Sequence, residues 1–396
     1  MLCVNKKNAT LFYIVIQALY FSANAMVFCY ASAYLLHRGL SNGQIGITMG
    51  ASYILSALLQ PALAMLVERT NIRISSLLSM LYAVFVLASL ALLLLPLSSA
   101  SLIAIMIVVT SIQSSAQVSV NALHRGHIQN GITINFSLAR GIGSVMYSLS
   151  NFCTGRLLLH TSIVHLPKFY LVAAVLLIGM LLLFQGDPTA EDSPQAITAT
   201  QKTLLLKKYP YFCFFLAGLA CLSITHSFTE TYLLQIIQRF GGTSSDLGTI
   251  FGIAAITELP AMLLYSKVYK KLGNRHLLAF AGWMWVIKNF LIMMAGNIYV
   301  VYAAALLQFF SFAIYVPAAI RYISHAIPKS EFLKGQSIAG SAFTIGSIFA
   351  AFVGGQMIDR IGITPTLWLV QIFSVAGVIL FTVAMFGSIR NTPYND

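Results

Sequence analysis

The sequence predicts an all-α membrane protein with 12 transmembrane helices in two pseudo-symmetric six-helix bundles. Hydrophobic residues make up 58% of the 396 residues and charged residues only 8%, whereas soluble proteins contain about 25% charged residues. The apolar residues form runs of about 18–25 residues, which is long enough for a helix to cross about 30 Å of hydrocarbon. One long polar gap divides these runs into two sets of six.

The predicted spans follow one another from a short polar start to the end of the chain. In the first set they are Leu11–Leu36, Ile45–Leu66, Ile74–Leu95, Leu102–Leu123, Phe136–Leu157 and Pro167–Phe184. In the second set they are Tyr211–Ile236, Leu247–Tyr265, Leu277–Met294, Ile298–Ile320, Ile338–Met357 and Thr366–Phe386. We therefore expect an N-terminal bundle at residues 1–184, a flexible cytoplasmic linker at 185–208 and a C-terminal bundle at 209–396.

Basic residues predict how the chain lies in the membrane. Most of them fall in connections that lie on one side: Lys6, Lys7, Arg69, Arg73, Arg125, Lys202, Lys207, Lys208, Lys267, Lys270, Lys271, Arg275, Arg321, Lys329, Lys334 and Arg390. The other side carries Arg38, Arg156, Lys168, Arg239 and Arg360. Lysine and arginine favour the cytoplasmic side, so we expect a multi-pass protein of a bacterial-type inner membrane with both termini in the cytoplasm.

The same distribution accounts for most of the net charge of +13 without a nucleic-acid partner, since the chain has no basic stripe or groove-reading motif. The five cysteines have no metal-ligand spacing. P-loop and GxSxG motifs are absent as well. We therefore expect no enzyme, cofactor or metal site, and energy for uphill transport would come from an ion gradient.

The two halves contain similar stretches. Gln44-Ile45-Gly46 and Gly50 precede a basic turn at Arg69 and Arg73, while Asp246-Leu247-Gly248 and Gly252 precede Lys271 and Arg275. The offset is about 200 residues at each pair, and such duplication with a site between the halves is typical of transporters. Chance similarity among Gly- and Leu-rich spans is the alternative.

Four motifs carry a resemblance to a known family: Gly39-Leu40-Ser41 through Gln44-Ile45-Gly46, Val67-Glu68-Arg69-Thr70, Arg140 followed by Gly143, and Thr257-Glu258-Leu259-Pro260. Together they resemble the major facilitator superfamily, in particular the branch that holds lactose permease and the phenylpropionate permeases. The resemblance covers essentially the whole chain. It implies a transporter that works by alternating access.

The sequence also departs from that branch. Lys288 stands where relatives tend to carry arginine, and His226 is similar to a histidine of phenylpropionate-type members. Asn121 takes the place of an acid that pairs with the helix-five arginine in relatives. Gln308 and Ser311 stand in the region where lactose-type members carry histidine and glutamate, so the lactose-type proton path does not transfer.

Polar stripes mark three spans of the first half. At helical spacing, the stripes are Gln17, Phe21, Asn24 and Phe28; Gln113, Gln117 and Asn121; and Arg140, Ser144, Tyr147 and Asn151. Such stripes can simply join helices, with each hydrogen bond worth about 0.6–2 kcal/mol. Three stripes in one half, one of them with an arginine, favour a wet cavity.

Ionisable residues also lie within the spans of the second half. A charged side chain in hydrocarbon costs at least about 2.5–3.5 kcal/mol and usually has a partner. His226 and Glu230 are one turn apart and can touch, although Glu230 can also be a solvated carboxylate at a mouth. Glu258 and Lys288 can form a purely structural pair or a switching pair.

These residues predict a proton-coupled symporter for a small polar solute, either a sugar or oligosaccharide or a small carboxylate. The expected substrate-binding residues are Gln17, Asn24, Gln117, Asn121, Arg140, Tyr147, His226, Lys288 and Gln308, and the expected proton-coupling residues are Glu258, Glu230 and His226. The expected partners are the solute, protons and the lipid bilayer, with the protein as a monomer. Proton-driven efflux of sugars or amphipathic drugs and a non-transporting membrane sensor are the alternatives.

Overall fold

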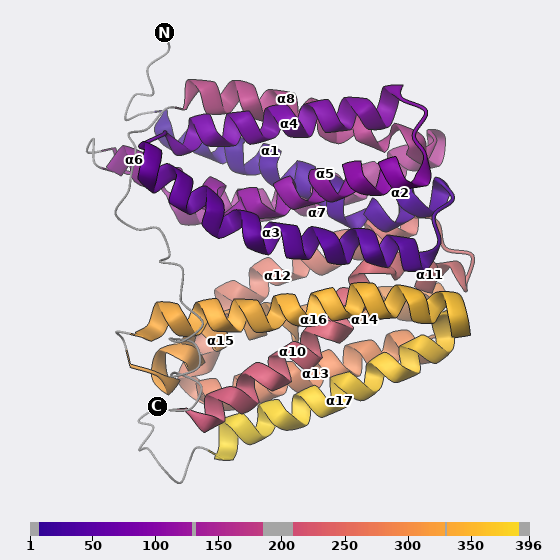
Figure 1. Cartoon of the computed structure of the whole chain (residues 1–396). Coiled ribbons are helices and arrows are strands. Elements are labelled where there is room, and N and C mark those ends of the chain that lie inside the picture. Colours follow the sequence, from indigo (N-terminus) through magenta and orange to yellow (C-terminus); the bar gives the residue numbers. More distant parts are fainter. Residues whose placement is uncertain (1–7, 129–131, 185–208, 329–330, 388–396) are drawn as a thin grey trace. The chain divides into compact units, whose positions relative to one another are not determined.

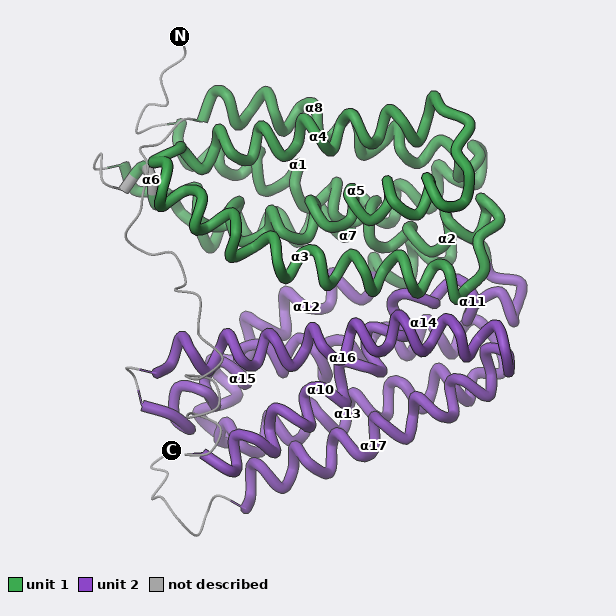
Figure 2. Tube along the Cα trace, in the orientation of Figure 1, with its two compact units in different colours: residues 1–194, 243–252 green, residues 195–242, 253–396 purple. Residues whose placement is uncertain are grey.

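The computed structural model describes residues 8–128, 132–184, 209–328 and 331–387 (Figure 1). Within these ranges every regular element is a helix, which confirms the predicted all-α class. The predicted linker at 185–208 lies outside the described residues. The chain divides into two compact units, the first comprising residues 1–194 and 243–252 and the second residues 195–242 and 253–396 (Figure 2).

The predicted bundle boundaries stay a prediction, and the division by contacts differs from them in one respect. Residues 243–252, which contain the first turns of α12, group with the first unit. The helices of the first unit are α1 (Ala9–Cys29), α2 (Ala31–His37), α3 (Asn42–Thr70), α4 (Ile74–Leu94), α5 (Ser99–Ala122), α6 (Arg125–Ile128), α7 (Phe136–His160), η1 (Ile163–His165) and α8 (Leu166–Leu183). Among them α1 packs against α5, α7 and α8, while α4 packs against α5 and α8.

The second unit repeats the order of the long helices with one exception. Its helices are α10 (Pro210–Thr231), α11 (Leu233–Gln238), α12 (Ser244–Leu272), α13 (Asn274–Met294), α14 (Ile298–Leu306), η2 (Leu307–Phe309), α15 (Phe312–Ala326), α16 (Phe332–Ile361) and α17 (Ile363–Gly387). The exception is that α14, η2 and α15 stand where the first unit has the single helix α5. Here α10 packs against α16 and α17, as α1 packs against α7 and α8 in the first unit. The similarity of the two halves therefore extends from sequence motifs to the helix contacts inside each unit.

Eleven helical segments of the described chain are long and apolar enough to cross a membrane. The remaining predicted span corresponds to α7, a helix of 25 residues. Its composition is less apolar because it carries Arg140, Arg156 and several glycine, serine and asparagine residues. In the first unit α7 packs along α1, so polar residues on its inner face meet protein rather than lipid.

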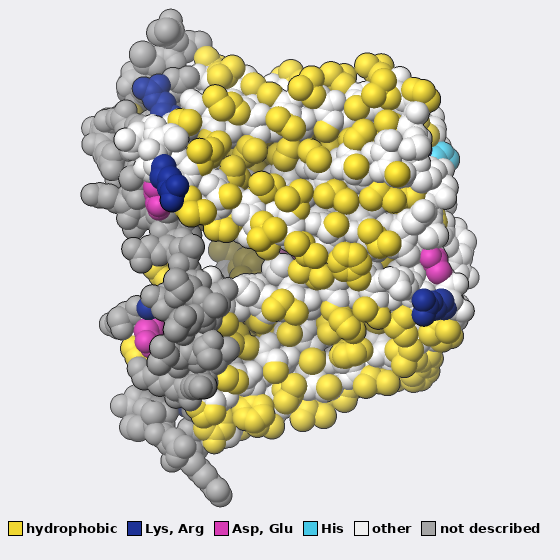
Figure 3. Space-filling view, in the orientation of Figure 1, with side chains coloured by type: hydrophobic (Ala, Val, Ile, Leu, Met, Phe, Trp, Pro, Cys, Tyr) yellow, Lys and Arg dark blue, Asp and Glu magenta, His cyan; other side chains and the backbone are white. Residues whose placement is uncertain are grey.

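The flanks of both units present apolar side chains to their surroundings. On the face shown in Figure 3, hydrophobic side chains cover the sides of the helices, and charged side chains gather near helix ends. Leu58, Leu87 and Leu263 are 64%, 67% and 76% exposed. Exposed leucines along spans of this length suit a hydrocarbon environment, in which helices satisfy their own backbone hydrogen bonds.

Three predicted spans are interrupted, which corrects the expectation of continuous helices. Tyr30 separates α1 from α2, and Tyr232 separates α10 from α11 at the corresponding place of the second half. Both tyrosines are fully buried. Tyr30 donates a hydrogen bond to the Asn151 carbonyl oxygen at 2.6 Å, and Tyr232 donates one to the Ala351 carbonyl oxygen at 2.8 Å. The third interruption, at η2 between α14 and α15, lies within the candidate site.

Close approach of backbones fixes the centre of the second unit. A Cβ atom at Gly218 on α10 would lie 2.8 Å from the Gly377 carbonyl oxygen on α17. Glycine is therefore required where these helices cross. Around this crossing, a large aromatic core that includes Phe215, Trp285 and Phe381 holds α10, α13 and α17 together.

Candidate functional site

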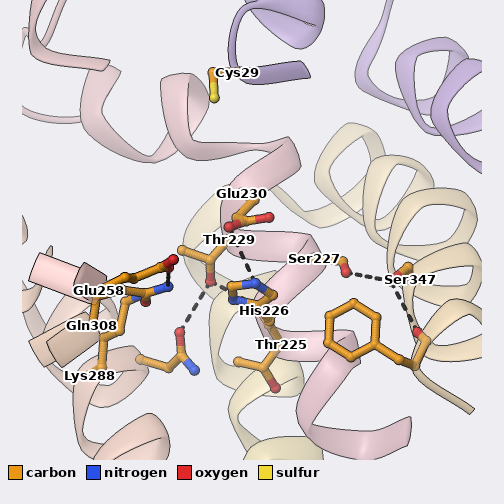
Figure 4. A network of polar contacts seen from close by, with 12 residues as sticks. Cys29, Thr225, His226, Ser227, Thr229, Glu230, Glu258, Lys288, Gln308 and Ser347 are labelled. Atoms are coloured by element: carbon orange, nitrogen blue, oxygen red, sulfur yellow. Dashed lines mark hydrogen bonds and ion pairs between the residues drawn. The ribbon is translucent and has the colours of Figure 1, made fainter. Parts of the chain in front are cut away.

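The second unit joins two of the predicted charged residues through an amide. Lys288 on α13 donates a hydrogen bond from Nζ to Gln308 Oε1 at 2.6 Å. Gln308 in turn donates from Nε2 to Glu258 Oε1 on α12 at 2.9 Å (Figure 4). Gln308 is buried, whereas Glu258 and Lys288 are half-buried. Gln308 therefore links Glu258 to Lys288, and its predicted role as a substrate ligand stays a prediction.

Local irregularities in the helices position Gln308 and Glu258, two members of this link. Gln308 lies in the 3₁₀ turn η2, where the predicted span Ile298–Ile320 is interrupted. Glu258 lies on α12 just before Pro260, which cannot donate a backbone hydrogen bond. Irregular backbone at membrane depth is tolerated where protein or a water-filled cavity surrounds it. Interrupted helices near mid-membrane are also where transporters form solute and ion sites.

His226 and Glu230 form a second group on α10. His226 Nε2 lies 3.3 Å from Glu230 Oε1, with the histidine side chain 7% and the glutamate side chain 51% exposed. The imidazole stacks on Phe312 with ring centroids 4.7 Å apart and meets the edge of Trp285 at 5.1 Å. These aromatic rings fix the orientation of the imidazole, while the carboxylate keeps access to its surroundings.

Lys288 connects the two groups electrostatically. Its ammonium group interacts with the carboxylates of both Glu230 and Glu258, and it also interacts with His226. One lysine thus interacts with two carboxylates and an imidazole within the second unit.

Two residues beside this cluster are not among those that the sequence predicted. Asn289 follows Lys288 directly and accepts a hydrogen bond from Thr229 Oγ1 at 3.3 Å, while its own Nδ2 donates to the Trp285 carbonyl oxygen at 3.0 Å. Phe312 forms the stacking face for His226. A polar residue adjacent to an intramembrane lysine was a signal for Asn289, but nothing in the sequence distinguished Phe312 from other aromatic residues.

The first unit brings two of its predicted residues together. Gln17 on α1 donates from Nε2 to Asn121 Oδ1 on α5 at 3.2 Å and to the Tyr13 hydroxyl oxygen at 2.7 Å. Tyr13 donates to the carbonyl oxygens of Val120 and Asn121, each at 3.2 Å. Gln17 Oε1 is buried and accepts no hydrogen bond from the residues that the structure describes. A buried acceptor of this kind can receive a hydroxyl or N–H donor from a solute.

Arg140 on α7 packs against an aromatic ring of α1. Its guanidinium lies over the Phe21 ring, 4.1 Å from the centroid, and donates from one terminal nitrogen to Ser144 Oγ at 2.8 Å. A guanidinium is always protonated and stacks well on aromatic rings. The arginine is therefore held in a defined position by α1 and by its own helix.

The remaining residues predicted in the first unit are less closely joined. Tyr147 on α7 contacts Cys29, with the hydroxyl oxygen 3.0 Å from Sγ, and Asn24 and Gln117 lie half-buried on α1 and α5. Gln113, from the same stripe as Gln117, is fully buried and bonds to Tyr20 and Tyr82. These hydrogen bonds join α5 to α1 and α4, and the wet cavity expected from the stripes stays a prediction.

The predicted binding residues therefore fall into two sets, one in each unit, and a common chamber for both sets stays a prediction. In the part of the chain that the structure describes, no group of three or more His, Cys, Asp or Glu side chains is placed to hold a metal ion. The side chains around Lys288 can bind protons and can donate and accept hydrogen bonds.

Comparisons with known proteins agree with this architecture. The model of the MFS_1 like family matches residues 11–386. A stretch of 151 residues is 26% identical to the "Uncharacterized transporter YwbF" of Bacillus subtilis, and one of 146 residues is 25% identical to a "Putative sugar efflux transporter" of Deinococcus radiodurans. Each match covers 37% of this chain and 37% of the relative, so the chain matches well under half the length of either.

Solved structures extend the likeness to the whole chain. The crystal structure of the nucleoside transporter NupG superposes with a TM-score of 0.80 at 13% identity, covering 96% of this chain and 99% of the other. A bacterial homologue of the human lysosomal transporter Spinster, in an inward-facing and unoccupied conformation, has a TM-score of 0.71 at 14% identity, covering 98% and 99%. At these identities the likeness concerns the fold.

Proposed function

Because this chain belongs to the MFS_1 like family of the major facilitator superfamily, we propose that it is a secondary active transporter that carries a small polar solute together with protons. The main support for this proposal is the pair of hydrogen bonds that links Glu258 through Gln308 to Lys288. It ties a group that can take up a proton to a cation that can bind a solute. The family and the membrane-spanning helices support the same function.

The link suggests how the two events are coupled. When Glu258 is ionised, Gln308 donates a charge-assisted hydrogen bond to it, and such bonds are about twice as strong as neutral ones. Protonation of Glu258 weakens that bond and frees the amide to turn. Lys288 then exchanges its bond to Gln308 for a bond to an oxygen of the solute. Proton uptake thereby raises the affinity for solute, and by linkage solute binding favours proton uptake.

His226 and Glu230 serve in this proposal as the path by which a proton reaches the cluster. Glu230 is exposed on half of its side chain and touches the buried His226, which in turn interacts with Lys288. In this proposal the first unit also contributes polar groups that bind the solute: Gln17, Asn24, Gln117, Asn121, Arg140 and Tyr147. Hydroxyls of a sugar and the oxygens of a small carboxylate both suit these donors and acceptors.

Glu258→Gln is the variant that tests proton coupling. In proteoliposomes with an internal pH dye, we expect the wild type to acidify the interior when a sugar or small carboxylate from a test panel is added outside. Glu258→Gln should lose this proton movement and solute accumulation, while it still exchanges labelled solute across the membrane. Glu68→Gln, at an exposed carboxylate in the last turn of α3, is the matched control and should behave as wild type. Wild-type proton uptake by Glu258→Gln would contradict the mechanism.

The alternative to uptake is export of a sugar, and one observation favours it. The Deinococcus radiodurans relative that is 25% identical over 146 residues carries the description "Putative sugar efflux transporter". The same proton cluster would then drive solute outward in exchange for protons. Accumulation of a labelled sugar in expressing cells above the level in control cells supports uptake, and accumulation below that level supports export.

A further inference from the structure

A basic cavity opens at one end of the second unit, away from the Glu258–Gln308–Lys288 link. It encloses about 450 Å³. Its charged lining consists of Lys270 and Lys271 from the end of α12, Arg321 from α15, and His276 and His325. Among the described residues that line it, none is a carboxylate. Three side chains that are cationic at neutral pH therefore share one recess.

The walls of this cavity are held by hydrogen bonds between uncharged groups and by one contact of Arg321 with an aromatic ring. Asn274, the first residue of α13, donates to the Ala318 carbonyl oxygen on α15 at 3.1 Å and accepts a hydrogen bond from Tyr265 on α12. The Arg321 guanidinium lies over the Tyr269 ring, 4.1 Å from its centroid. The three helix ends are thus fixed to one another, and Arg321 is fixed in place. A binding site preorganised in this way loses less entropy when it takes a ligand.

Backbone polarity adds to the positive character of the cavity. Gly273, at the N-cap position of α13, has a positive φ of 76° and provides no side chain to cap the helix. The first N–H groups of a helix carry a partial positive charge and favour anions. In this cavity they act together with three cationic side chains from two other helices, which makes an anion the chemically matched ligand.

The turn between α3 and α4 in the first unit corresponds to the turn between α12 and α13, but it lacks the purely basic character of that turn. There Asn71 has a positive φ of 51° between α3 and α4, as Gly273 has between α12 and α13. Arg69 corresponds to Lys271, but Glu68 stands where the second unit has Lys270. The repeated turn therefore has mixed charge in one half and is entirely basic in the other.

We propose that this cavity binds the phosphate headgroup of an anionic phospholipid. The cavity lies at the end of membrane-spanning helices, and Leu272, which also lines it, is 58% exposed, so apolar surface for an acyl chain adjoins the cations. Basic pockets between transmembrane helices are a known form of lipid headgroup site. A soluble phosphate compound shares the headgroup chemistry but has no acyl chain to use this apolar surface.

Lys270→Glu and Lys267→Glu form a matched pair for testing the site. Both change the net charge equally on exposed positions of α12, but only Lys270 lines the cavity. Thermal stability of the full-length protein in detergent is measured as dioleoylphosphatidylglycerol, dioleoylphosphatidylcholine or sn-glycerol 3-phosphate is added. We expect half-saturation by phosphatidylglycerol to require about tenfold more lipid for Lys270→Glu, and nearly wild-type amounts for Lys267→Glu. Arg321→Gln should weaken binding as well.

Each other outcome would overturn the proposal. If Lys270→Glu and Lys267→Glu require the same amount of phosphatidylglycerol, lipid binding depends on the overall charge of the protein and not on the cavity. If phosphatidylcholine stabilises as well as phosphatidylglycerol, the headgroup charge has no part. If sn-glycerol 3-phosphate stabilises the protein as effectively as phosphatidylglycerol, the ligand is a soluble phosphate compound and the lipid assignment is wrong.

Discussion

Gln308 illustrates how a single uncharged side chain can contribute to the stability of a membrane protein. It is 3% exposed and accepts from Lys288 while it donates to Glu258. Gln308→Met preserves most of the side-chain volume but leaves Lys288 without that partner. A buried donor left unsatisfied costs about 1–3 kcal/mol, and more when it is charged. We therefore expect a clearly lower Tm for purified Gln308→Met than for wild type.

Further substitutions provide the control for this prediction. Replacing every partner of a buried interaction with apolar groups can be nearly neutral, so Gln308→Met combined with Lys288→Met and Glu258→Met should recover much of the lost stability. If the triple variant is less stable than Gln308→Met alone, the loss in Gln308→Met does not come mainly from the unpaired charged groups.

At this scale the sequence singled out the charged residues of the candidate site, but not the hydrogen bonds that connect them. His226, Glu230, Glu258 and Lys288 were recognised because charged groups are costly in hydrocarbon. The part played by Gln308 was not, because it depends on a 3₁₀ turn that has no proline or glycine within it. Hydropathy gives no information about which uncharged polar residue joins two charged ones.

At the scale of elements, the close crossing of α10 and α17 predicts that a larger residue at Gly218 destabilises the protein. Gly218→Ala would place a Cβ atom 2.8 Å from the Gly377 carbonyl oxygen and 2.9 Å from the Phe381 backbone nitrogen. These are backbone atoms, so the helices must separate, and overpacking of this kind costs about 1–3 kcal/mol. Gly218→Ala should therefore lower Tm by several degrees.

Gly179→Ala on α8 is the matched control, because nothing lies within 4 Å of its added Cβ atom. It should leave Tm unchanged or raise it slightly, since alanine favours helix more than glycine does. Equal effects of the two substitutions would mean that the α10–α17 contact does not limit stability.

Element positions followed from hydropathy, but the interruptions did not. The breaks at Tyr30 and Tyr232 contain no proline or glycine, and each tyrosine hydroxyl bonds to a carbonyl oxygen on a helix that is distant in sequence. A break that depends on a tertiary contact leaves no local signal. Its recurrence about 200 residues later is visible only once both halves are folded.

For the whole molecule, we propose that both termini lie in the cytoplasm of a bacterial-type inner membrane, and the ends of α12 allow a direct test. Arg239 lies before this helix, and Lys271 lies in its last turn. Because basic residues favour the cytoplasmic side, the end with Lys267, Lys270 and Lys271 should face inward. In a variant without the native cysteines, Lys271→Cys should react with a membrane-impermeant maleimide only in inside-out vesicles. Arg239→Cys should react in intact spheroplasts. The opposite pattern would invert the proposed topology and place the basic cavity on the outer face of the membrane.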